Sequence, residues 1–192
     1  MTLATRITIL RILLIPPFVG ALLYYDENPA SAGWHWLAVG LFILAALSDA
    51  VDGWLARRFR QRSELGAVLD PLADKALLLA TIITLALIHV PGLYRLPLWF
   101  LTLVLGRDAI LLLGFAVLHW FTRHVRVQPH WSGKVSTALQ MTAVSLILLK
   151  FECLRIDWWV RAAGVFTAVS LMVYIVRGVN VIKESGCGTP SR

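Results

Sequence analysis

The stretch from residue 49 to residue 74 reads Asp49-Ala-Val-Asp52-Gly53-Trp-Leu-Ala56-Arg57, then eight residues, then Gly66-Ala-Val-Leu-Asp70-Pro-Leu-Ala-Asp74. It concentrates four carboxylates in a chain that has only 11 acidic residues in all. On a helix, the members of the first pair lie three positions apart and those of the second pair four, so each pair shares one helix face. Apolar residues flank both pairs. Carboxylates so close to apolar segments are costly unless they meet a cation, which indicates a functional site.

The rest of the chain is too apolar for a soluble globule. Of its 192 residues, 58% are hydrophobic and 15% are charged, and the mean hydropathy is +0.74. We therefore predict an all-α polytopic membrane protein with six transmembrane helices in one bundle. The predicted spans are 5–25, 34–59, 65–89, 96–121, 132–151 and 158–181. They form one domain over residues 1–183, and a disordered tail is expected over 184–192.

The basic residues predict the orientation of the spans. One side of the membrane collects Arg6, Arg11, Arg57, Arg58, Arg60, Arg62, Arg123, Arg126, Lys134, Arg177, Lys183 and Arg192. The other side holds Arg95, Lys150, Arg155 and Arg161. This asymmetry places both termini and the carboxylate stretch on the cytoplasmic side of a bacterial-type inner membrane. The net charge of +7 is then explained by this bias and by attraction to anionic headgroups, with no nucleic-acid partner.

The four aspartates offer only oxygen ligands. Such a set suits Mg²⁺ or Mn²⁺, and four negative charges more than balance one divalent ion, which makes a two-metal site plausible. Gly53 and Gly66 leave room for close approach of a ligand or a helix. Arg57 follows the first pair by about one helical turn, within reach of a phosphate at the same site. The pattern predicts a polar cavity for metal and a phosphate compound at the cytoplasmic side.

The whole pattern resembles the signature of the CDP-alcohol phosphatidyltransferases. Every fixed position of Asp-x-x-Asp-Gly-x-x-Ala-Arg, eight residues, Gly-x-x-x-Asp-x-x-x-Asp is met, over 26 residues. The resemblance extends to a layout of six spans and to Arg107-Asp108 and Ser132-Gly133-Lys134, which are similar to the glycerophospholipid branch.

The resemblance implies a mechanism and a set of site residues. Members of the family transfer a phosphatidyl-type group from a CDP-linked lipid to an alcohol and release CMP. Two Mg²⁺ ions, or Mn²⁺, would be held by Asp49, Asp52, Asp70 and Asp74. Asp74 would also act as the base on the acceptor hydroxyl. The CDP part of the donor, CDP-diacylglycerol, would be lined by Gly53, Ala56, Arg57 and Gly66. The family also forms homodimers.

The acceptor is left open by this stretch. The candidates for its pocket are charged residues within or near the later spans, because buried charges in spans tend to be functional. They are Arg107, Asp108, Lys134 and Arg177. We favour glycerol-3-phosphate as acceptor, giving phosphatidylglycerophosphate. The alternative is a CMP-forming cardiolipin synthase that uses phosphatidylglycerol, since phosphatidylglycerophosphate enzymes often carry Arg-Glu where this chain has Arg107-Asp108.

Two other classes fit less well. Intramembrane prenyltransferases also use aspartate-rich motifs with Mg²⁺, but they usually have more spans and an Asn before the first aspartate, where this chain has Ser48. A cation carrier would need polar residues continuing across the membrane. The spans that carry the aspartates are apolar beyond their cytoplasmic ends.

Overall fold

The computed structural model describes an all-helical chain. The backbone is described for residues 3–59, 64–121, 131–151 and 155–186, and the side chains for 8–48, 73, 75–113, 133–151 and 155–176. These ranges contain six helices: α1 (Leu3–Glu27), α2 (Ala32–Phe59), α3 (Glu64–Leu87), α4 (Leu98–Phe121), α5 (Trp131–Leu148) and α6 (Ile156–Gly186). Each helix overlaps one predicted span, so the prediction of an all-α fold is confirmed. Helix α6 continues past residue 183, the expected end of the domain, and residues 187–192 lie outside the described chain.

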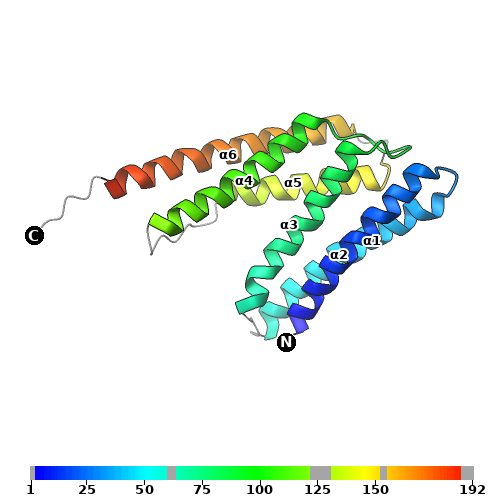
Figure 1. Ribbon diagram of the computed structural model, residues 1–192, viewed down its shortest axis with the longest axis horizontal. Helices are drawn as coiled ribbons and strands as arrows, with labels where there is room; N and C mark the ends of the chain where they lie inside the picture. Colours follow the sequence, from blue (N-terminus) through cyan, green and yellow to red (C-terminus); the bar gives the residue numbers. More distant parts are fainter. Residues whose placement is uncertain (1–2, 60–63, 122–130, 152–154, 187–192) are drawn as a thin grey trace, which may run out of the picture. The chain divides into compact units, whose positions relative to one another are not determined.

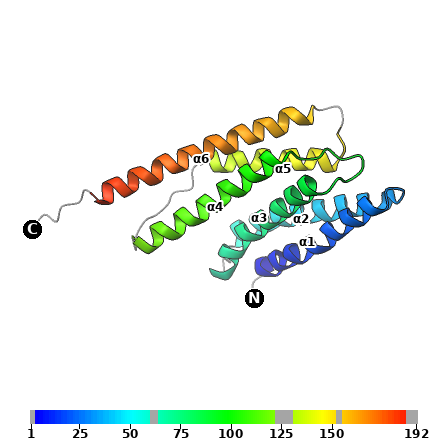
Figure 2. The ribbon, with the colours of Figure 1, turned by 45° about the horizontal axis from the view of Figure 1, so that its top comes forward.

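The chain divides into two compact units. Unit 1 comprises Met1–Leu98 and Val144–Leu154, and unit 2 comprises Trp99–Ala143 and Arg155–Arg192. Within unit 1, α1 and α2 run side by side in opposite directions, and α1 also packs along α3 (Figure 1). Within unit 2, α4 and α6 run in the same direction and α5 runs opposite to them (Figure 2).

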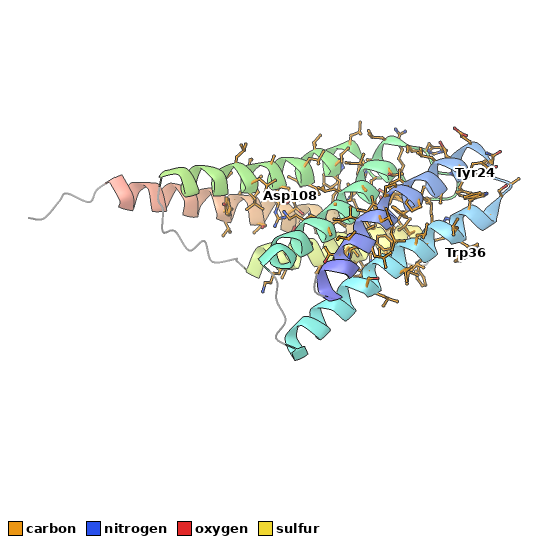
Figure 3. All side chains as sticks on the ribbon, turned by 60° about the horizontal axis from the view of Figure 1, so that its bottom comes forward. Tyr24, Trp36 and Asp108 are labelled. Carbon is orange, nitrogen blue, oxygen red and sulfur yellow. The ribbon has the colours of Figure 1, made fainter. Side chains whose placement is uncertain are left out.

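The turn between α1 and α2 is explained by its residue types. Pro29 cannot continue α1, and the Asn28 amide still donates to the Tyr24 carbonyl at 3.0 Å. Ser31 immediately precedes α2, a position that serine favours, and its carbonyl accepts from the Trp34 amide at 3.0 Å. The rings of Tyr24 and Trp34 lie 4.5 Å apart across the turn. Figure 3 labels Tyr24 and Trp36 at this end of the hairpin.

The core of unit 1 is a set of apolar side chains at helical spacing. Phe18 and Leu22 on α1 and Ile82 on α3 are fully buried, and the rings of Phe18 and Phe42 lie 5.9 Å apart. The outward faces are also apolar, with Leu13 at 68% and Leu47 at 58% exposure. A helix that is apolar on all sides is typical of a membrane or of a large core.

Two helices meet a length and hydropathy test for crossing a membrane within the part of the chain that is described. They are the segments Thr8–Glu27 of α1 and Ile156–Val176 of α6. Shorter apolar helical segments cover Ala32–Ser48 and Lys75–Leu87. The coarse prediction of apolar, membrane-type helices therefore agrees with the structure, whereas six complete spans in one bundle stay a prediction.

Helix α5 ends in a turn that places Lys150 in the left-handed region. The Phe151 amide donates to the Leu146 carbonyl at 3.2 Å and the Lys150 amide donates to the Ile147 carbonyl at 3.1 Å. This pair of bonds is the Schellman ending, in which glycine is usual at the position of Lys150, whose φ is 53°. The Lys150 side chain compensates, because Nζ donates to Tyr25 Oη at 3.2 Å and lies 5.3 Å from the centre of that ring.

Candidate active site

The four aspartates lie on consecutive helices of unit 1. Asp49 and Asp52 are ten and seven residues before the end of α2, and Asp70 and Asp74 are six and ten residues after the start of α3. At a helical rise of about 1.5 Å per residue, these positions are about 15, 10, 9 and 15 Å from the connected helix ends. Measured along its own helix, Asp49 is therefore as far from the end of α2 as Asp74 is from the start of α3, and Asp52 and Asp70 lie at similar distances from these ends.

The side chains of these aspartates lie outside the described residues, as do those of the predicted CDP-binding residues. Gly53, Ala56 and Arg57 occupy the last two turns of α2, and Gly66 occupies the first turn of α3. Their backbone is helical, so the pairs at three- and four-residue spacing do share helix faces, as the sequence predicts. Among the side chains that are described, no group of three or more His, Cys, Asp or Glu could hold a metal ion.

A buried cation lies at the same end of unit 1. Arg11 is eight residues into α1, about 12 Å from its first residue, and only 1% exposed. Because α1 runs opposite to α2, the start of α1 lies beside the end of α2 (Figure 1). The sequence pattern indicates Arg11 only as one of the charges that orient the spans. The available signal was a charged residue enclosed by apolar neighbours in the run Ile9-Leu10-Arg11-Ile12-Leu13.

The predicted acceptor residues Arg107 and Asp108 are both described, and both are buried in unit 2. Arg107 is 5% exposed and Asp108 8% exposed, and Asp108 is labelled in Figure 3. Arg107 Nη1 donates to Asp108 Oδ1 at 2.7 Å. Side chains adjacent in sequence do not normally face each other on a helix. The Arg107 side chain must therefore bend toward Asp108, and the ion pair holds its guanidinium in that orientation. Arg107 Nε finds no hydrogen-bond partner within the described chain.

The structure brings Gly133 to this guanidinium. A β-carbon on Gly133 would lie 3.1 Å from Arg107 Nη2 and 4.0 Å from Ser170 Oγ. The neighbouring Lys134 is exposed. Arg177 lies on α6, seven residues after Ser170, and its side chain is outside the described residues. Of the four predicted acceptor residues, the structure thus brings together Arg107 and Asp108, and it places Lys134 next to their contact with α5.

A buried polar cluster that sequence analysis did not identify joins α5 to α6. Gln140 Nε2 donates to Thr167 Oγ1 at 2.8 Å and to Ser136 Oγ at 3.3 Å. The Thr167 hydroxyl donates to the Ala163 carbonyl at 2.6 Å, so Ser136 must be the donor in its 2.8 Å bond with Thr167. All three side chains are at most 1% exposed. Their signal in the sequence is the four-residue spacing of Ser136 and Gln140 on one face of an apolar helix.

Comparison with known proteins identifies the family of this chain. The model of the CDP-alcohol phosphatidyltransferase family matches residues 1–181. The chain is 33% identical to a probable phosphatidylglycerophosphate synthase of Mycobacterium tuberculosis over 185 residues, covering 95% of this chain and 81% of the relative. It is 34% identical to the CDP-diacylglycerol–glycerol-3-phosphate 3-phosphatidyltransferase of Escherichia coli K12 over 169 residues, covering 84% of this chain and 81% of the relative. A match of this extent shows that the chain belongs to the CDP-alcohol phosphatidyltransferases, a family of transferase enzymes.

Proposed function

We propose that this protein transfers the phosphatidyl group of CDP-diacylglycerol to a hydroxyl of glycerol-3-phosphate, giving phosphatidylglycerophosphate and CMP. The observation that carries the proposal is the family match over residues 1–181, joined to relatives that are named for this reaction. The aspartate pattern between Asp49 and Asp74 supports it, because every fixed position of that pattern is present.

The residues of the aspartate pattern fit a divalent-metal site. The hard oxygen ligands are four carboxylates near the end of α2 and the start of α3, namely Asp49, Asp52, Asp70 and Asp74. We propose that they hold two Mg²⁺ ions, with Mn²⁺ as a substitute. When bound there, the ions would supply Lewis-acid polarisation of the diphosphate and charge neutralisation of departing CMP. The protein's own contribution is to hold four carboxylates together in an apolar segment, where they would otherwise be costly.

Asp74 is the proposed base. Its carboxylate takes the proton from the acceptor hydroxyl, whose oxygen then forms a bond to the phosphorus that carries the diacylglycerol. The bond from that phosphorus to the oxygen of CMP breaks, and CMP leaves with the electron pair.

The end of α2 and the start of α3 are the proposed donor pocket. Gly53, Ala56 and Gly66 have small side chains or none, which allows the cytidine diphosphate to approach the helices. Arg57 would bind a diphosphate oxygen through its guanidinium. Arg11, buried at the same end of unit 1, is placed to balance negative charge there.

Arg107 and Asp108, with Lys134 and Arg177, are the proposed acceptor pocket. Asp108 offsets the charge of Arg107, so this pair has little net charge and contributes mainly oriented hydrogen-bond donors. The phosphate of glycerol-3-phosphate carries between one and two negative charges at neutral pH. Lys134 and Arg177 would provide the remaining positive charge.

We further propose six membrane spans in one bundle, with both termini and the polar cavity at the cytoplasmic side. Apolar side chains on the outward helix faces and the asymmetry of the basic residues support this placement. A homodimer in the bacterial-type inner membrane is proposed from the resemblance to the family.

The experiment that tests the function compares two acceptors. Purified protein in nanodiscs is given CDP-diacylglycerol and Mg²⁺ with glycerol-3-phosphate or with phosphatidylglycerol, and both CMP and the lipid product are measured. We expect CMP release with glycerol-3-phosphate and a phosphatidylglycerophosphate product. Cardiolipin formed with phosphatidylglycerol as acceptor, together with no product from glycerol-3-phosphate, would instead establish the cardiolipin synthase alternative. No CMP with either acceptor would refute both.

A second experiment tests the base. Asp74→Asn should reduce kcat at least about a hundredfold, since general-base catalysis contributes about 10²–10⁴. Asp26→Asn, in the last helical turn of α1 and far from the carboxylate pattern along the chain, is the matched control and should retain activity. An Asp74→Asn enzyme with a near-normal rate would exclude Asp74 as the base.

A further inference from the structure

Unit 2 holds an incompletely satisfied guanidinium. Arg107 is 5% exposed, its Nη1 donates to Asp108, and its Nε has no hydrogen-bond partner within the described chain. A buried donor of a charged group destabilises the protein unless an acceptor forms a hydrogen bond with it. Because Asp108 engages Nη1, the unused donor lies on the edge formed by Nε and Nη2. This edge is the one that binds carboxylates and phosphates with two parallel hydrogen bonds.

Gly133 and Ser170 bound this region from the other two helices. The point where a Gly133 β-carbon would lie is 3.1 Å from Arg107 Nη2 and 4.0 Å from Ser170 Oγ. Ser170 is 6% exposed, and its hydroxyl is therefore also buried in unit 2. The missing side chain of Gly133 thus lets a guanidinium from α4 and a hydroxyl from α6 lie around one point beside α5. Any larger residue at 133 would require the guanidinium to shift.

We propose that Gly133 and Ser170, with the Nε–Nη2 edge of Arg107, select a phosphomonoester as the acceptor; this rests on the proposed glycerol-3-phosphate activity. The three donors are Arg107 Nε, Arg107 Nη2 and the Ser170 hydroxyl. A phosphomonoester has three terminal oxygens and can accept from all three donors. A phosphodiester such as phosphatidylglycerol has only two terminal oxygens, and its second ester group meets the buried hydroxyl. Glycine at 133 keeps the guanidinium in the position that this match requires.

The test uses full-length protein in nanodiscs with CDP-diacylglycerol and Mg²⁺, and follows CMP release as glycerol-3-phosphate is varied. Methyl phosphate and dimethyl phosphate are the probes, since they differ in the number of terminal oxygens. We expect methyl phosphate to compete with glycerol-3-phosphate at least about tenfold more strongly than dimethyl phosphate, the factor that corresponds to about one hydrogen bond to a charged group.

Two variants with matched controls locate the effect. Ser170→Ala should raise KM for glycerol-3-phosphate about tenfold and weaken methyl phosphate inhibition by the same factor, with kcat nearly unchanged. Gly133→Ala should raise the same KM by displacing Arg107. The control for the glycine change is Gly106→Ala on α4, where a β-carbon meets nothing within 4 Å. The control for the hydroxyl change is Thr142→Ala, at an exposed position on α5. Both controls should keep the wild-type KM.

The outcomes separate this inference from the proposed function. Wild-type protein that does not use glycerol-3-phosphate would overturn the function itself. Wild-type turnover with an unchanged KM in Ser170→Ala, or equal inhibition by the two methyl esters, would overturn the inference alone. Thermal unfolding of each variant is measured alongside. If Gly133→Ala does not fold, Ser170→Ala, which removes one oxygen atom and adds no volume, decides the matter.

Discussion

The tether between Lys150 and Tyr25 allows a prediction that separates backbone strain from side-chain bonding. Lys150 occupies a glycine-type position with φ of 53°, which costs a residue with a β-carbon about 1 kcal/mol. Its ammonium recovers this cost by donating to Tyr25 Oη at 3.2 Å and by lying 5.3 Å from the ring centre. A hydrogen bond of this kind contributes about 1 kcal/mol and a partly exposed cation–π contact about 0.5–1 kcal/mol.

Two substitutions at residue 150 should therefore differ in a defined order. Lys150→Met keeps the left-handed strain and loses both interactions, so it should lower the free energy of unfolding by about 2 kcal/mol. Lys150→Gly loses the same interactions and relieves the strain, for a net loss of about 1 kcal/mol. For a chain of this length, each kcal/mol corresponds to about 2–4 °C in Tm. Lys150→Gly should thus melt a few degrees above Lys150→Met, and both below wild type.

The measurement is thermal unfolding of purified protein in one detergent, followed by tryptophan fluorescence. Tyr25→Phe is the matched control, because it keeps the ring and removes only the hydroxyl that accepts from Lys150. In that background the effect of Lys150→Met should fall by about 1 kcal/mol, the share of the hydrogen bond. A Lys150→Met protein as stable as wild type would refute the tether. A Lys150→Gly protein no more stable than Lys150→Met would refute the strain.

Three further predictions concern packing, the polar cluster and the metal. Gly164→Ala should lower the free energy of unfolding by about 1–3 kcal/mol, because its β-carbon would lie 2.6 Å from the Trp99 ring. The control Gly106→Ala, whose β-carbon would meet nothing within 4 Å, should not. Equal melting temperatures of the two variants would contradict this prediction. Thr167→Val should destabilise more than Gln140→Leu, by about 1–2 kcal/mol in urea or thermal unfolding, because it leaves Ser136 and Gln140 without their shared buried partner. The reverse order would contradict the central place of Thr167 in the cluster. Chelation of divalent ions should abolish CMP release and added Mg²⁺ should restore it, so activity that persists in excess chelator would exclude metal dependence.

The fold was predictable where apolar periodicity and turn residues agree. The expected span 34–59 and helix α2 end at the same residue, and the helix starts two residues earlier because Ser31 precedes it. Helix α5 ends at Leu148, three residues before the expected end at residue 151. The hydropathy of Leu149 and Phe151 extended that prediction, and hydropathy does not register a left-handed turn at Lys150.

The part of the site whose residues lie close together in the sequence was predictable, and the part formed by distant helices was not. The aspartates are recognised by spacing along two helices, a property of the sequence alone. The contact between Arg107 and Gly133 joins residues that are 26 positions apart, and nothing in the spacing of either residue indicates it. Ser170 and Thr167 were missed for the same reason, because the sequence of an apolar helix does not show which residues on other helices its hydroxyl groups contact.

The proton directions in the cluster of Ser136, Gln140 and Thr167 have a consequence for assembly. Each bond crosses from α5 to α6 or supports one that does, and the single hydroxyl hydrogen of Thr167 is already committed within α6. Sliding α6 along α5 by one turn, about 5.4 Å, would break every crossing bond together. Helices α5 and α6 packed in any other register would form none of these crossing bonds, so the cluster favours a single register of the two helices.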